Sequence, residues 1–266
     1  MNKMRALVKM NNKRNYEDPA LYCTYLCTLI IVVVIVGIIC AKAILGPSVN
    51  KADTTSEDLS FIFHNIMLGF MAGTMGICYN VMLSVPLMKD KANGNIESML
   101  AASASIKDIW ISKTLSLYWP SVYTTFGFTI VTSFILKMMY FKDGFTLQWN
   151  GWFLAAIFIA VPIVYLSECF LVNLVGLCFS VEISNVIGSI FGPGFAILSI
   201  NFCARNIINT NSCALFLTYI AMAVIIMIVC LCLYKKIDKE KVVLSCKAEA
   251  ANSVKQHGKK PKKKNV

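Results

Sequence analysis

The chain has 266 residues, of which 57% are hydrophobic and only 15% are charged. A soluble domain is usually about 45–50% apolar and about 25% charged, so this composition excludes an ordinary soluble domain and indicates a membrane protein. The formal net charge is +11, but the basic residues flank apolar runs, which membrane topology explains better than nucleic-acid binding does.

The first predicted element is a cytoplasmic N-terminal segment over residues 1–20. It places Met4, Leu7, Val8 and Met10 among lysines and arginines, which is typical of a short amphipathic helix lying on the inner membrane surface. A frayed, positively charged anchor for the following span is an alternative interpretation.

Residues 21–234 contain six apolar stretches, each as long as or longer than the roughly 20 residues that a transmembrane helix needs. The first exceeds the apolar core of a cleaved signal peptide, about 7–15 residues, so we expect it to be retained. The fifth contains Gly-Pro-Gly and is expected to be broken or re-entrant. The six predicted spans are Leu21–Leu45, Phe61–Leu87, Leu115–Leu136, Trp152–Phe179, Ile183–Phe202 and Cys213–Tyr234.

The second span carries small residues on one helical face. Gly69, Gly73 and Gly76 recur at helical spacing, followed by Asn80. Small residues let helices approach closely, so the glycines predict a packing face toward another span or a second copy of the chain. Asn80 either hydrogen-bonds across helices or lies on a substrate pathway.

A polar segment, KDKANGNIESMLAASASIKDIW at residues 89–110, separates the second and third spans. Its Asn93-Gly94-Asn95 sequence is typical of a turn. We expect Asn95 to cap a short helix over about 95–103, with Glu97 in the first turn where a negative charge favours the helix dipole.

This predicted helix is amphipathic, because Ile96, Met99 and Leu100 recur at helical spacing. After it, Ser105 and Asp108 have the spacing of a capping box and predict the start of the next helix. Composition leaves open whether the apolar face rests on lipid head groups or docks into a partner.

Two polar residues stand within the fourth span. Glu168 is ionisable, and an ionisable residue inside a membrane is a candidate for function, here a substrate contact. A neutral carboxyl bonded to a neighbouring polar group is the alternative. Asn173 fits the same substrate pathway or a hydrogen bond between helices.

Residues 235–266 form a basic tail that holds 11 of the 25 lysines and arginines. We expect it to be disordered. With a cytoplasmic N-terminus, 20 of the 25 basic residues face the inside and five face the outside. The positive-inside rule therefore predicts a plasma-membrane protein with both termini and the 89–110 segment in the cytoplasm.

Catalytic and metal-binding motifs are absent from the sequence. The 11 cysteines include no Cys-x-x-Cys pair, and most lie in apolar runs where cysteine acts as a small hydrophobe, so no disulfide framework or metal site is expected. There is also no phosphate-binding Gly-x-x-x-x-Gly-Lys-Ser/Thr loop. The chain is therefore not expected to be an enzyme.

The segment that begins at Lys89 resembles the characteristic cytoplasmic segment of type-2 ABC exporter permeases. The family's usual proline is replaced by a small residue near Ala104. Six spans with both ends inside also resemble the family, so the similarity covers nearly the whole chain. The matching residues are Asp90, Lys91, Gly94, Ile96, Glu97, Met99, Leu100, Ala101, Ser103, Ser105, Ile109 and Lys113.

The resemblance implies that the 95–103 helix is a coupling helix, which inserts into a cleft of a separate ATPase subunit. It implies two ATPase copies that bind ATP and Mg, no cofactor on this chain, and a second permease protomer in a homodimer. The implied function is outward transport of an amphiphilic substrate (peptide, drug or lipid-like) by alternating access. The implied ATPase contacts are Asn95, Ile96, Glu97, Met99, Leu100 and Ser103.

An alternative function is a membrane-embedded immunity or assembly protein without transport activity. It would have no stable ATPase partner, and this separates it from the permease.

Overall fold

The computed structural model describes residues 2–16, 54–102, 104–141, 145–180 and 209–258, with shorter stretches between 23 and 49 and between 183 and 201. Every regular element in these residues is helical. Four helical stretches are long and apolar enough to cross a membrane, so the described chain is an all-α membrane protein. They are Ser56–Gly76, Ile106–Tyr140, Gly151–Cys178 and Cys213–Tyr234.

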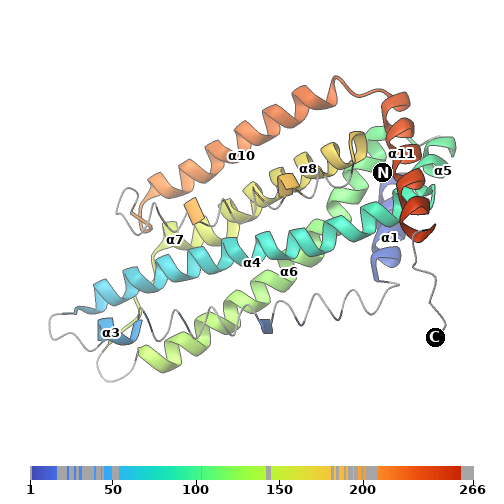
Figure 1. The fold of residues 1–266 in the computed structure, drawn as a ribbon. Coiled ribbons are helices and arrows are strands. Elements are labelled where there is room, and N and C mark those ends of the chain that lie inside the picture. The colour runs from blue at the N-terminus through green and yellow to red at the C-terminus, as the bar shows by residue number, and fades with distance from the viewer. Residues whose placement is uncertain are drawn as a thin grey trace, which may run out of the picture.

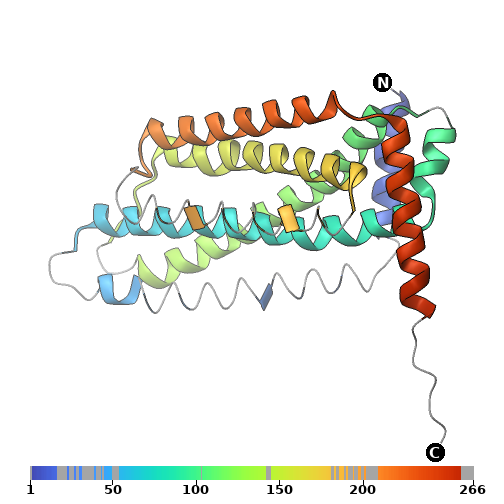
Figure 2. The ribbon, with the colours of Figure 1, turned by 45° about the horizontal axis from the view of Figure 1, so that its top comes forward.

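The described residues form a bundle of long helices with short helices across one end (Figure 1). The long helices are α4 (Ser56–Ala92), α6 (Ile106–Tyr140), α8 (Val161–Cys178) and α10 (Cys213–Tyr234), with α7 (Gly151–Ala155) and the π-helical η2 (Ala156–Ala160) leading into α8. The remaining elements are α1 (Asn2–Tyr16), α3 (Gly46–Val49), α5 (Asn95–Ala101) and α11 (Lys239–Gly258). Figure 2 shows α11 crossing the bundle end where α1 and α5 also lie.

Side-chain caps fix where α4 and α6 begin. Thr55 and Asp58 form a capping box before α4, and Ser105 and Asp108 form the predicted capping box before α6. Each box satisfies two backbone N–H groups that the first helical turn leaves without partners. Helices α4 and α6 therefore extend beyond the apolar limits predicted for the second and third spans. The predicted sixth span has the bounds of α10, while the first and fifth fall largely outside the described residues.

Two apolar clusters fill the bundle. The larger one joins α4, α6, η2, α8 and α10 and is represented by the fully buried Phe63, Met71 and Val164. The smaller one lies at the α5 end, where Trp110 of α6 stacks on Tyr234 of α10 at 5.3 Å between ring centroids. This second cluster gives the short helices an apolar surface to pack against.

The N-terminal helix is docked on the bundle. Asn11 of α1 is 2% exposed, and its side-chain amide donates to the hydroxyl of Ser112 on α6 at 3.2 Å. Helix α1 thus packs against the start of α6, and the interpretation of a frayed anchor does not fit residues 2–16.

The prediction of a disordered basic tail is wrong for residues 239–258. Residues Lys239–Gly258, expected to be disordered, form α11. Val242 and Cys246 are each 1% exposed and belong to the smaller apolar cluster. Their spacing of four residues puts both on one helical face. Burying that face stabilises the helix despite the surrounding lysines.

Candidate functional site

A tight turn sets the position of α5. Gly94 has a φ of 67°, in the left-handed region that glycine adopts without strain. It occupies the helix cap, so the prediction that Asn95 caps the helix is wrong. Asn95 is the first helical residue, and its side-chain amide donates to Asp90 Oδ1 at 3.0 Å. Helix α5 ends at Ala101, short of the predicted residue 103, and Ser103 lies outside the described residues.

A buried ion pair holds α5 to two long helices. Lys113 Nζ of α6 donates to Asp90 Oδ2 at the end of α4, and the two side chains are 7% and 5% exposed. Because Asp90 also accepts the hydrogen bond from Asn95, one carboxylate links α4, α5 and α6. Charged pairs with additional hydrogen bonds are the form in which buried charges are tolerated.

Lys91 links the same corner to α8 and α11. The side chain is 1% exposed, and its Nζ donates to the Phe179 carbonyl at 2.6 Å and to Ser245 Oγ at 3.0 Å. The Ser245 hydroxyl in turn donates to the Leu177 carbonyl at 2.8 Å. These carbonyls lie at the C-terminus of α8, where a helix leaves acceptors unsatisfied and favours a positive charge. Lys91 therefore caps α8 and holds α11 against it.

The apolar face predicted for partner contact is largely buried within the chain. Ile96 is 0% exposed and Met99 is 7% exposed. Both pack in the smaller cluster with Val242 and Cys246 of α11. The physical reason is that α11 is folded, so it covers the face that a disordered tail would have left open. Ile96 and Met99 position α5 and do not form its outer surface.

The opposite face of α5 is the one available to a partner. Ser98, Ala101 and Ala102 are exposed, and Glu97 and Leu100 are half-buried. Exposed basic residues surround this end of the bundle on α1, α4, α6, α11 and the link before α11. They are Arg5, Lys9, Lys13, Lys89, Lys107, Lys235, Lys236, Lys239, Lys241 and Lys247.

The polar residues predicted within the fourth span lie inside the bundle. Glu168 is 4% exposed, and the part of the chain that the structure describes offers its carboxyl no hydrogen bond or ion pair. Asn173 Nδ2 donates to the Cys169 carbonyl one turn earlier, at 3.0 Å. Asn80 belongs to α4, but its side chain is outside the described set.

The predicted glycine face gives a mixed result. Gly69 and Gly76 are buried, while Gly73 is half-buried. A Cβ built on Gly73 would meet no atom within 4 Å. Close helix approach within the described part of the chain therefore does not require glycine at position 73.

Lys91 and Lys113 carry structural roles that the sequence analysis did not assign to them. Both were matched to the family segment, but nothing in the spacing showed that their ammonium groups would be buried. The signal that could have found them is the proximity of basic residues to helix C-termini and to an acidic residue, as in Asp90-Lys91.

Comparisons of the chain with family models, curated proteins and solved structures find no match. Among the described residues, no group of three or more His, Cys, Asp or Glu side chains could hold a metal ion.

Proposed function

We propose that this chain is the transmembrane permease subunit of an ABC exporter. It would move an amphiphilic peptide, drug or lipid-like substrate outward by alternating access, powered by a separate ATPase subunit. The working unit would contain two ATPase copies and two permease protomers. Six spans, with both termini in the cytoplasm, complete the proposed arrangement.

The observation that supports the proposal best is the rigid mounting of α5. A helix that transmits force must move together with the transmembrane helices and must expose a face to the motor. Helix α5 is tied to α4 and α6 through Asp90 and Lys113, and its face with Ser98 and Ala101 is exposed. An ordinary loop helix resting on lipid would not need a buried ion pair at its base.

Charge distribution supports the proposed orientation. Among the described residues, most exposed lysines and arginines gather at the end of the bundle that carries α1, α5 and α11. Lys137 lies in the last turn of α6, toward the other end. An excess of basic residues marks the cytoplasmic side of membrane proteins, so the α5 end would face the ATPase and its ATP supply.

The test is purification of the full chain with an ABC ATPase of its own organism, followed by measurement of ATP hydrolysis in liposomes. We expect a stable complex whose turnover changes when a transported amphiphile is added. Purification of the intact chain without any ABC ATPase, under conditions where it remains folded, would overturn the proposal and favour an immunity or assembly protein.

Two variants test the contact itself. Ser98→Trp and Ala101→Trp both alter the exposed face of α5, and each should weaken ATPase binding and substrate-dependent turnover. Ala221→Trp is the matched control, because Ala221 is exposed on the apolar α10. Equal ATPase binding by all three variants would remove α5 from the interface.

A further inference from the structure

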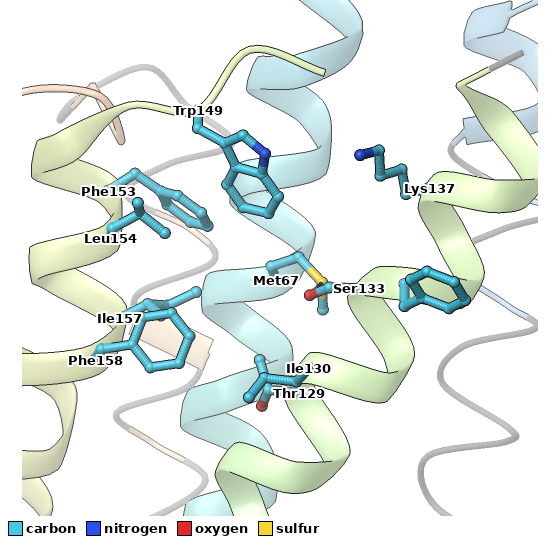
Figure 3. Close-up of a pocket in the computed structure, with 11 residues that line it drawn as sticks. Met67, Thr129, Ile130, Ser133, Lys137, Trp149, Phe153, Leu154, Ile157 and Phe158 are labelled. Atoms are coloured by element: carbon cyan, nitrogen blue, oxygen red, sulfur yellow. Dashed lines mark hydrogen bonds between the residues drawn. The ribbon is translucent and has the colours of Figure 1, made fainter. Parts of the chain in front are cut away.

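A cavity lies near the end of the bundle opposite α5. Its volume is about 590 Å³, within the roughly 300–1,000 Å³ typical of ligand pockets. Figure 3 shows its walls, which come from α4, α6 and the α7–η2 segment. The lining residues are Met67, Thr129, Ile130, Ser133, Phe134, Lys137, Trp149, Phe153, Leu154, Ile157 and Phe158.

The π-helical segment forms one wall of this cavity. Ile157 and Phe158 belong to η2, where the wider π-helical turn changes the direction of side chains relative to a continuous α-helix. Single π-helical turns inside α-helices occur frequently at functional sites. The wall geometry is thus of a kind associated with binding.

The cavity is mainly apolar, although two hydroxyl groups lie in its wall. The Ser133 hydroxyl contacts Met67 Sδ at 2.8 Å, and the Thr129 hydroxyl contacts Met71 Sδ at 3.2 Å. Both hydroxyls therefore already have a partner on α4. The remaining uncharged lining is aliphatic or aromatic, which suits a hydrocarbon chain.

Among the described residues that line the cavity, Lys137 is the one ionised side chain. It is exposed, and the described residues contain no ion-pair partner for it. In Figure 3 its ammonium group points toward the side of the cavity that carries Trp149. Trp149 and the nearby Trp152 are 52% and 48% exposed, as expected of tryptophans at a membrane–water interface.

The position of Lys137 along α6 fits a depth at the membrane–water interface. It lies on α6 about seven turns beyond Lys113, or roughly 36 Å at the rise of an α-helix. The hydrocarbon core of a bilayer is about 30 Å thick. A lysine at this position can keep its ammonium group among lipid head groups while its stem covers apolar surface.

We propose that the cavity is a binding site for an anionic amphiphile, with the hydrocarbon chain in the apolar part and a carboxylate or phosphate head group paired with Lys137. The charge of Lys137 favours an anionic head group over a cationic one, and the apolar walls favour a chain over a small ion. Binding needs no ATPase, so the site goes beyond the proposed transport function and does not depend on it.

Photoaffinity labelling of the purified full chain in detergent tests this site. The probes are a diazirine-bearing C16 fatty acid and the same chain with a trimethylammonium head group, and adducts are mapped by mass spectrometry. We expect adducts on the lining residues of α6, α7 and η2. The carboxylate probe should label them about two- to fivefold more than the ammonium probe, as for one partly exposed ion pair.

Two variants separate the two parts of the site. Lys137→Gln should abolish the preference for the carboxylate probe and keep labelling by the ammonium probe. Leu154→Trp should lower labelling by both probes severalfold, because the indole fills the cavity. Lys107→Gln, an exposed lysine at the other end of the bundle, is the control and should change neither.

Specific results would overturn the proposal. One is adducts spread evenly over the exposed face of α10, and another is equal labelling by the two probes in the unaltered protein. Because Lys137 is exposed, Lys137→Gln is expected to fold even if Leu154→Trp does not. A head-group preference that survives Lys137→Gln would therefore also exclude the assigned role of Lys137.

Discussion

Lys113 of α6 and Asp90 of α4 form a buried ion pair at the base of α5. Asp90 also accepts a hydrogen bond from Asn95, the first residue of α5. The two long helices and the short helix therefore share one carboxylate. A displacement of α5 cannot occur without disturbing α4 and α6, which is the mechanical property that a coupling element requires.

Removing one partner of this pair should destabilise the protein strongly. Asp90→Ala deprives the buried Lys113 of this counter-charge, and breaking a buried pair typically costs about 3–5 kcal/mol. The double variant Asp90→Leu with Lys113→Met should cost less than Asp90→Ala alone, because no charge is left behind. Thermal unfolding in detergent provides the measurement.

Lys107→Met is the control for this comparison, since Lys107 is exposed and surface changes usually stay within about 0.5 kcal/mol. If Asp90→Ala lowers the melting temperature no more than Lys107→Met does, the ion pair does not hold the α5 corner.

The turn before α5 should tolerate few residues at position 94. Gly94→Ala places a Cβ at a φ of 67°, where an L-residue pays about 1–2 kcal/mol. The added atom itself has room, since its nearest neighbour is Glu97 Oε2 at 3.8 Å. The expected loss is therefore conformational, and Gly94→Asn should lose less stability than Gly94→Ala.

Gly127→Ala should stabilise the protein, in contrast to Gly94→Ala, and serves as the comparison. Gly127 lies inside α6, and a Cβ there would meet no atom within 4 Å. Alanine in a helix interior is favoured over glycine by roughly 0.5–1 kcal/mol. Equal melting temperatures for Gly94→Ala and Gly127→Ala would show that the left-handed turn is not required.

Local features of the fold could be predicted from the sequence, while long-range packing could not. The capping box of Ser105 and Asp108 depends on residues three apart, so its spacing was sufficient. The apolar face of Ile96 and Met99 was also visible. What covers that face was not, because Val242 and Cys246 lie well over a hundred residues later.

Helix α11 was not predicted from the sequence because the tail is rich in lysine. Lysines are typical of disordered termini, and this pattern outweighed the apolar spacing of Val242 and Cys246. The cavity could not be predicted from the sequence for a related reason. It joins Met67, Lys137 and Ile157 from three separate helices, and no motif in the sequence connects them.

The packing of α11 predicts slow alkylation of Cys246. The residue is 1% exposed, and burial raises the pKa of its thiol. Because the thiolate is the reactive form, a raised pKa leaves less of it at pH 7.5. We expect a water-soluble maleimide to react more slowly with Cys246 in the folded protein than in detergent-unfolded protein, because the folded thiol is shielded and less of it is ionised.

The alkylation rate of Cys246 should depend on pH in a definite direction. The rate at Cys246 should keep rising above about pH 8.5, where an ordinary thiol is half ionised. Val242→Asp should release α11 and raise the rate at pH 7.5, while Lys236→Gln at an exposed position ten residues earlier should leave it unchanged. A rate at Cys246 equal to that in the unfolded protein would mean that α11 does not pack on α5.

The central claim is that the outer face of α5 contacts an ATPase, and site-specific photo-crosslinking tests it most directly. A benzophenone amino acid is placed at Ser98 on α5, or at Ala221 on α10 as the control, in membranes that contain the partner ATPase. The account predicts an adduct with the ATPase from position 98 and none from position 221. Absence of the adduct at position 98, in a complex shown to be intact, would contradict it.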